Sequence, residues 1–165
     1  MRRKMVWTLS AIALLVLASQ PAFAEQRAEI GCGKGVVGKR ADENYFCSGS
    51  YRPEWLQRDW KLYYGTFYRQ KDGRVVNIVG VDQYLNAYVP QEKLPSPLIQ
   101  IGWGFSVFDK LTENLGSQGE LHLFFKIGAI KGNQYWAFAA DHFSNGGLTR
   151  NNQGENFITI VWGIV

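Results

Sequence analysis

The chain has 165 residues and a formal net charge of +4, from 18 Lys and Arg against 14 Asp and Glu. Three of the cations are Arg2, Arg3 and Lys4, so the rest of the chain is nearly neutral and offers no basic tract for a nucleic acid. We therefore expect no nucleic-acid partner.

Residues 1–24 are typical of a secretory signal peptide. The basic start is followed by an apolar run from Val6 to Ala18 and then by Ala22-Phe23-Ala24, the small-x-small pattern that signal peptidase recognises. The apolar run is shorter than the ~20 residues that a membrane-spanning helix needs, and Gln20-Pro21 interrupts the segment. We predict that residues 1–24 direct export and are removed, which leaves residues 25–165 as a single domain.

Cys32 and Cys47 are the only cysteines, and both lie in the exported part. An even number of cysteines in an oxidising periplasm favours a disulfide between them. Two free thiols are the alternative, and a metal site is disfavoured because no histidine accompanies them. The bond would link the first two predicted strands.

The exported part has the pattern of strands separated by turn residues. Turn signals are clearest at Lys71-Asp72-Gly73, Pro95-Ser96-Pro97 and Lys131-Gly132-Asn133. The predicted strands, in chain order, are residues 27–37, 44–52, 58–70, 74–89, 97–108, 118–130, 132–144 and 155–165. These make eight strands, the smallest usual number for a bacterial outer-membrane barrel.

The strand at residues 97–108 shows which fold the alternation favours. Its large apolar residues fall on one face: Ile99, Ile101, Trp103, Phe105 and Val107. Its small or polar residues fall on the other: Gln100, Gly102, Gly104 and Ser106. A soluble sandwich would turn the apolar face toward a second sheet, whereas a small transmembrane barrel turns it toward lipid and keeps small residues inside. We predict an all-β fold, an eight-stranded antiparallel transmembrane β-barrel, although the chain ends on Val165 and not on the usual aromatic residue.

The clearest chemical signal is at the end of the predicted strand 132–144. Period two places His142 and Ser144 on the same face as the apolar Trp136, Phe138 and Ala140. A His and a Ser two residues apart on one face can act together as general base and serine nucleophile. The alternative is that the strand simply ends there and both side chains reach the aqueous rim.

A longer pattern surrounds this pair: His142-Phe143-Ser144-Asn145-Gly146-Gly147-Leu148, followed by Asn152-x-Gly154. It resembles the signature of the lipid A 3-O-deacylases, the PagL family. The resemblance implies an outer-membrane serine-type esterase that removes the 3-position hydroxyacyl chain of lipid A, or of lipopolysaccharide, in the outer leaflet. It implies His142 as general base, Ser144 as nucleophile and Asn145 as part of an oxyanion hole, with no metal and no cofactor. Whether two copies form a homodimer stays open.

The match to the family fails at the third catalytic residue. The family's acid lies two residues after the position of Gly154, where this chain has Asn156, and Glu155 comes one residue early. In a regular strand Asn156 shares the face of His142 and Glu155 does not. A bulge would turn Glu155 back toward His142, or Asn156 would orient the imidazole through its amide oxygen, which needs no distortion and is preferred. The third alternative is an impaired site in a structural or lipid-binding barrel.

Topology places the pair relative to the membrane. If both chain ends are periplasmic, the last two strands are joined on the extracellular side, next to His142 and Ser144. Both residues then lie near the outer leaflet, where lipid A resides.

The remaining polar residues of the strands are predicted to fill the barrel. Asp82, Glu120, Lys126 and Asp141 are expected as inward charges that form salt links, and His122 is expected inside or at the rim. Two histidines on separate strands without a supporting acid cluster make a poor metal site.

Overall fold

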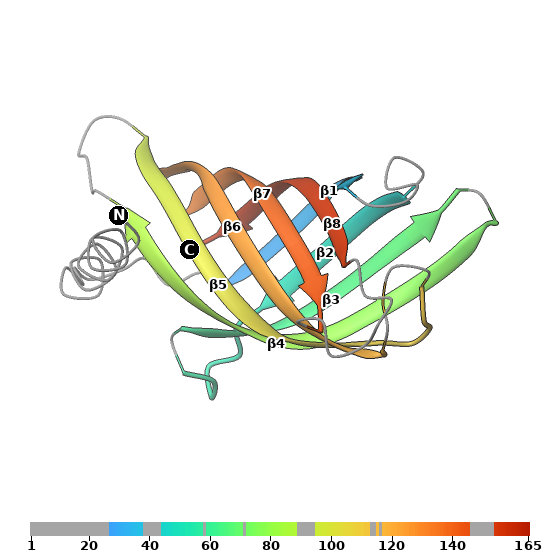
Figure 1. Ribbon diagram of the computed structural model, residues 1–165. Coiled ribbons are helices and arrows are strands. Elements are labelled where there is room, and N and C mark those ends of the chain that lie inside the picture. Colours follow the sequence, from blue (N-terminus) through green and yellow to red (C-terminus); the bar gives the residue numbers. More distant parts are fainter. Residues whose placement is uncertain are drawn as a thin grey trace, which may run out of the picture.

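The computed structural model describes residues 27–37, 44–57, 59–70, 72–88, 95–112, 115, 117–145 and 154–165. These residues form eight antiparallel strands in one closed barrel, in which each strand pairs with its neighbours in sequence and β8 closes onto β1 (Figure 1). The predicted all-β fold and its eight strands are confirmed. The expected signal peptide, residues 1–24, lies outside the described residues. Within the part of the chain described, no helix is long and apolar enough to cross a membrane.

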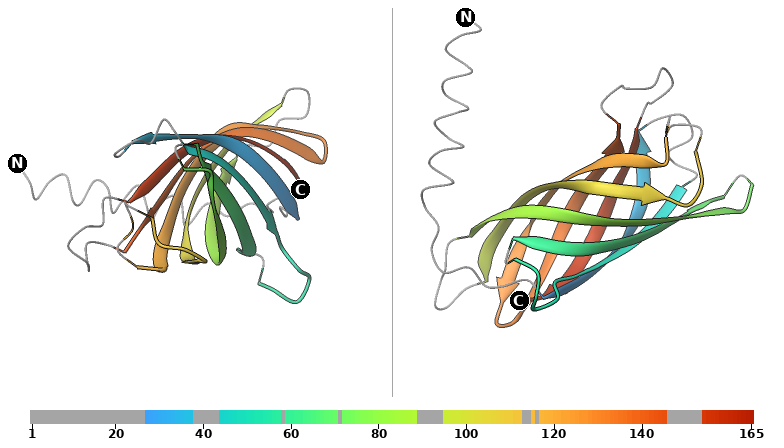
Figure 2. Two further views of the ribbon diagram at one scale, coloured as in Figure 1. Left: turned by 90° about the vertical axis from the view of Figure 1, so that its right-hand side faces the viewer. Right: turned by 90° about the horizontal axis from the view of Figure 1, so that it is seen from below.

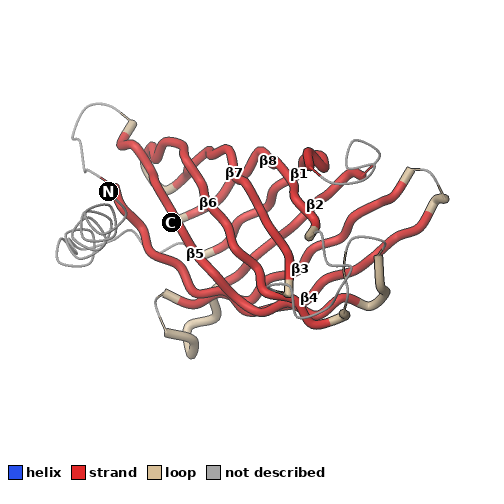
Figure 3. Tube along the Cα trace, viewed as in Figure 1, coloured by secondary structure: helices blue, strands red, loops and turns tan. Residues whose placement is uncertain are grey.

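The strands begin and end close to the ranges predicted from the sequence. They are β1 (Ala28–Val37), β2 (Asn44–Tyr51), β3 (Trp60–Arg69), β4 (Arg74–Tyr88), β5 (Ser96–Phe108), β6 (Gly119–Lys131), β7 (Gln134–Ser144) and β8 (Glu155–Ile164). No other regular element occurs among them, so the described chain is strand and turn throughout (Figure 3).

The two ends of the barrel differ in what they carry. One end holds the start of β1, the end of β8 and the short β6–β7 turn, while the other holds the β7–β8 connection and is called the site end here. The β3–β4 hairpin extends beyond its neighbours at the site end (Figures 1 and 2). The last residues of β7 and the first of β8 lie at the rim of the barrel at this site end.

Buried and exposed side chains alternate along the strands. On β5 the exposed residues are Ile99, Ile101, Trp103, Phe105 and Val107. Gln100 and Ser106, on the other face, are fully buried. Large exposed apolar residues occur on all eight strands, so they form an apolar outer wall of the kind that a transmembrane barrel presents to lipid. The predicted faces of β5 are confirmed.

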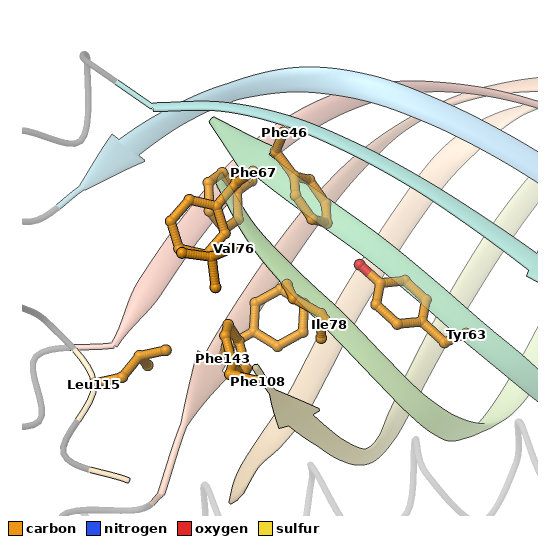
Figure 4. Packing of buried hydrophobic residues seen from close by; sticks show 9 residues of the cluster. Phe46, Tyr63, Phe67, Val76, Ile78, Phe108, Leu115 and Phe143 are labelled. Carbon is orange, nitrogen blue, oxygen red and sulfur yellow. The ribbon is translucent and has the colours of Figure 1, made fainter. Parts of the chain in front are cut away.

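The interior of the site end is filled by aromatic and aliphatic side chains. They come from six strands and the β5–β6 connection and point toward one another (Figure 4): Phe46, Tyr63, Phe67, Val76, Ile78, Phe108, Leu115, Phe143 and Phe157. A second apolar cluster at the opposite end consists of Leu98, Ile130, Tyr135, Ala137, Ala139 and Val161. Because apolar clusters occupy both ends, the charged side chains between them are shielded from water.

Glu29 is the centre of one buried ionic cluster. Lys61 donates to its carboxylate at 2.6 Å and Ser50 at 2.8 Å, and Lys126 and Tyr135 also donate to it. The inward position predicted for Lys126 is confirmed, but Glu29 and Lys61 were not predicted to lie beside it. One carboxylate thus lies between two buried ammonium groups, and the hydrogen bonds keep all three satisfied.

A second buried cluster surrounds His122, which is 1% exposed. Its two ring nitrogens lie 2.9 Å from Asp82 and 3.1 Å from Asp141. The predicted interior positions of these residues, and that of the buried Glu120, are confirmed. The expectation that no acids accompany the histidines is wrong for His122, because β4 and β7 each bring a carboxylate to it.

The structure joins Cys32 to Cys47 by a disulfide. The two residues are direct partners in the β1–β2 register, and both side chains are on the exposed outer face. The bond therefore links the first two strands on the outside of the barrel.

Glu29→Gln tests whether the first ionic cluster stabilises the barrel. The amide keeps the shape but removes the charge, which leaves Lys61 and Lys126 buried without an anion. We expect the free energy of unfolding to fall by about 3 kcal/mol, because an unpaired buried charge is costly. Urea titration, with the folded fraction read from the mobility of unheated samples on gels, measures the change. Glu54→Gln, at an exposed turn residue, is the matched control, and equal midpoints for the two variants would contradict the prediction.

Candidate active site

His142 and Ser144 occupy the last two outward positions of β7. Both are half-buried, and the residues between and before them, Phe143 and Asp141, are buried inside the barrel. Period-two geometry thus separates the two faces of the strand at this point. The structure places His142 and Ser144 on the same outer wall, as their spacing predicts.

Asn156 lies directly across from His142 on β8. The Nδ1 atom of His142 is 2.8 Å from Oδ1 of Asn156. Because an amide oxygen can only accept a hydrogen bond, Nδ1 must be the donor, and the proton-free nitrogen of the neutral ring is then Nε2. The contact therefore selects the tautomer in which Nε2 can take up a proton.

Glu155 points the other way. Its side chain is 2% exposed and accepts a hydrogen bond of 2.8 Å from Oγ1 of Thr112. The irregular pairing near this position lies on β1, between Gly35 and Val37, and β8 itself is paired regularly with β7 from Glu155 onward. The structure therefore does not bring Glu155 to His142, in contrast to the alternative in which a bulge turns it outward.

Gly154 allows the chain to pass close to the imidazole. Its φ is +72°, a left-handed conformation that favours glycine, and a Cβ at this position would lie 2.7 Å from Cε1 of His142. The same Cβ would lie 3.0 Å from the carbonyl oxygen of Phe143. Gly154 thus serves the site through close packing on His142, which the sequence pattern alone did not indicate.

Asn145 follows the serine and turns into the end of the barrel. It is 6% exposed, and its side-chain Nδ2 donates to Oγ of Ser117 at 3.5 Å. Ser117 in turn donates to Glu120 at 2.9 Å. The rest of the expected signature, Gly146 to Leu148 and Asn152, lies outside the described residues. The structure thus links Asn145 to the interior hydrogen bonds of the site end.

The surface around the pair is apolar. In the register, Leu121 lies beside Ser144 and Leu123 beside His142 on β6, and both leucines are about half exposed. On the other side, Ile158 follows Asn156 on the same face of β8. Polar groups of the site therefore lie in a wall suited to contact with acyl chains. Among the described residues, no group of His, Cys, Asp and Glu is arranged to hold a metal ion.

Comparison with known proteins relates this geometry to one family. Residues 44–165 match the sequence model of the family described as lipid A 3-O-deacylase (PagL). The fold is similar to a solved structure described as the crystal structure of the outer membrane enzyme PagL, with a TM-score of 0.61 and 20% sequence identity. The similarity covers 83% of this chain and 99% of that chain. No curated protein sequence matches the chain.

Gly154→Ala tests the packing around His142. The added methyl group has no room beside Cε1, so we expect the imidazole to move and its hydrogen bond to Asn156 to weaken. The chain contains two histidines, so the NMR signals of isotope-labelled imidazoles in micelles report the change at His142, with His122 as an internal reference.

Gly132→Ala is the matched control. Gly132 also has a positive φ, of +62°, but a Cβ there would meet nothing within 4 Å. Both variants therefore carry a similar backbone strain of about 1 kcal/mol, and only Gly154→Ala should shift the His142 signals. A shift of equal size in both would contradict the packing argument.

Proposed function

Because the chain belongs to the lipid A 3-O-deacylase (PagL) family, we propose that His142, Ser144 and Asn156 hydrolyse the ester at the 3-position of lipid A. The family and the closed barrel indicate an outer-membrane protein. The observation that carries the proposed mechanism is the contact of 2.8 Å between His142 and Asn156, made on the outer wall two residues from Ser144. The substrate is a lipid, and this wall is the surface that lipid would reach.

The first chemical step is transfer of the acyl chain to the enzyme. Oγ of Ser144 attacks the ester carbonyl while Nε2 of His142 accepts the hydroxyl proton. The resulting tetrahedral oxyanion needs a hydrogen-bond donor, and we assign this role to the main-chain N–H of Asn145, which directly follows Ser144, because the Asn145 side chain bonds to Ser117 inside the barrel. The intermediate then breaks the ester bond, and His142 returns the proton to the sugar oxygen that leaves.

The second step releases the acyl chain. Water attacks the acyl group on Ser144, with His142 again taking a proton, and a free hydroxy fatty acid departs as the serine regains its hydrogen. Throughout both steps Nδ1 of His142 donates to Asn156, which holds the ring in the required tautomer. An amide stabilises the transient imidazolium less than a carboxylate would, so we propose a working but slowed enzyme.

The position of the site supports lipid A as the substrate. The pair lies at the rim of the site end, and if the chain ends are periplasmic this rim is in the outer leaflet. Outward Leu121 and Leu123 flank the pair, so an acyl chain can stay in an apolar surrounding while its ester reaches Ser144. The substrate would therefore not have to leave the membrane.

Ser144→Ala tests the proposed nucleophile. We expect mass spectrometry of lipid A from cells that make the intact chain to show loss of one 3-position hydroxyacyl group, and cells with Ser144→Ala to keep it. Thr66→Ala, which also removes a hydroxyl group from an outward strand position, should behave like the intact chain. If the intact chain is present in the outer membrane and the acylation pattern does not change, the proposed function is wrong.

Asn156→Glu tests the role of the neutral residue beside His142. A carboxylate at this position would stabilise the imidazolium, so we expect kcat for ester hydrolysis to rise by roughly tenfold or more. Asn156→Gln, which has the same length without the charge, should show no gain. If neither the intact chain nor Asn156→Glu hydrolyses lipid A, the barrel is a non-catalytic member of the family.

A further inference from the structure

We propose that His122, inside the barrel, is a positioning residue that sets the orientation of His142 and Ser144 on the outside. The inference rests on the proposed function of His142 and Ser144. It adds to their site a residue whose side chain lies on the inner face of the barrel. His122 touches neither the substrate nor the reacting atoms. It acts through the two inward residues of β7 that flank His142.

His122 contacts both of these inward residues. It is the direct cross-strand partner of Phe143, and the two rings are stacked with centroids 4.2 Å apart and planes 7° apart. Its Nε2 lies 3.1 Å from the carboxylate of Asp141. A single buried ring therefore holds the residues immediately before and after His142 in the chain.

The ring of His122 is itself fixed from the far side. Its Nδ1 lies 2.9 Å from the carboxylate of Asp82 on β4, two strands away. Gly104 on β5 makes this contact possible, since a Cβ there would lie 2.2 Å from Oδ1 of Asp82. With a carboxylate at each ring nitrogen, the imidazole can donate two hydrogen bonds, and rotation of the ring would break both.

The inward residues are also held by contacts other than His122. Thr159 on β8 donates to Asp141 at 3.3 Å, and Phe143 packs edge-to-face on Phe108 with ring centroids 5.5 Å apart. These contacts, together with the pairing of β7 with β6 and β8, keep Asp141 and Phe143 inside. The stack and the hydrogen bond to His122 add a constraint that spans both residues at once. They therefore bear on the backbone at His142 and on the outward Cβ directions of His142 and Ser144.

Such positioning matters for catalysis because rate depends steeply on geometry. A displacement of about 1 Å between a nucleophile and its target can cost roughly 100-fold in rate. Binding of the lipid involves the apolar wall and is much less sensitive to the same displacement. Loss of a positioning residue should therefore lower kcat and leave KM nearly unchanged.

His122→Gln and Phe143→Leu test the proposal in barrels purified from outer membranes. His122→Gln leaves His142 as the single imidazole of the chain, so its NMR signals in micelles report its conformations directly. We expect one sharp set of His142 signals in the intact protein and broadened or multiple sets in both variants. We expect kcat of the folded fraction to fall roughly 10- to 100-fold, with KM within about twofold of the intact protein, as loss of positioning alone requires.

Glu29→Gln is the matched control, because it also perturbs a buried ionic cluster of the barrel. Glu29 bonds to Lys61, Lys126, Ser50 and Tyr135. It should lower stability while His142 keeps one set of signals and kcat is retained. If His122→Gln does not fold, Asp82→Asn takes its place, since it removes the charge that fixes His122 without altering β7.

The proposal is overturned if the folded variants keep the kcat of the intact protein, or if Glu29→Gln changes kcat and the His142 signals equally. It is also overturned if the His142 signals stay single and sharp in both variants. Failure of the intact chain to deacylate lipid A would contradict the proposed function instead. The NMR comparison does not require activity, so the two failures can be told apart.

Discussion

In a closed barrel of eight strands, each residue faces either the outer wall or a filled interior, and its neighbours in the chain face the other side. The site depends on this constraint. His142 and Ser144 can share the outer wall only because Asp141 and Phe143 point inward. The same rule separates Asn156, which contacts His142, from Glu155, which bonds to Thr112 inside. One strand thus carries the proposed catalytic residues on one face and packing residues on the other.

The interior shows how a narrow barrel can hold many charges. Glu29 lies between Lys61 and Lys126, and His122 lies between two carboxylates, so acidic and basic side chains alternate in space. Aromatic residues close the site end above them. Because each charged group in these clusters has a partner, the clusters avoid the cost of several kcal/mol that an unpaired buried charge would carry. The outer wall can then remain largely apolar.

The sequence was sufficient for features that depend on local spacing. Strand positions, the outward face of β5 and the common face of His142 and Asn156 follow from period two and from turn residues, which are properties of neighbouring residues. It was not sufficient for contacts across the barrel. Glu29 and Lys61 were missed, and Asp82 and Asp141 were not recognised as partners of His122. These contacts depend on the stagger of the strands and, for Glu29 with Lys126 and Tyr135, on closure of the barrel.

Asn156 shows why the two faces of the wall have to be considered together. A carboxylate at this position would orient His142 more strongly, but it would also place an ionised group on an outward face, where charge carries a cost that depends on depth in the membrane. The amide avoids that cost and still selects the tautomer of His142. The carboxylates near this stretch lie inside, where Asp141 contacts His122. Because the neutral amide of Asn156 orients His142 less strongly than a carboxylate would, the alignment of His142 and Ser144 depends more on the backbone of β7. The buried contacts of Asp141 and Phe143 hold that backbone.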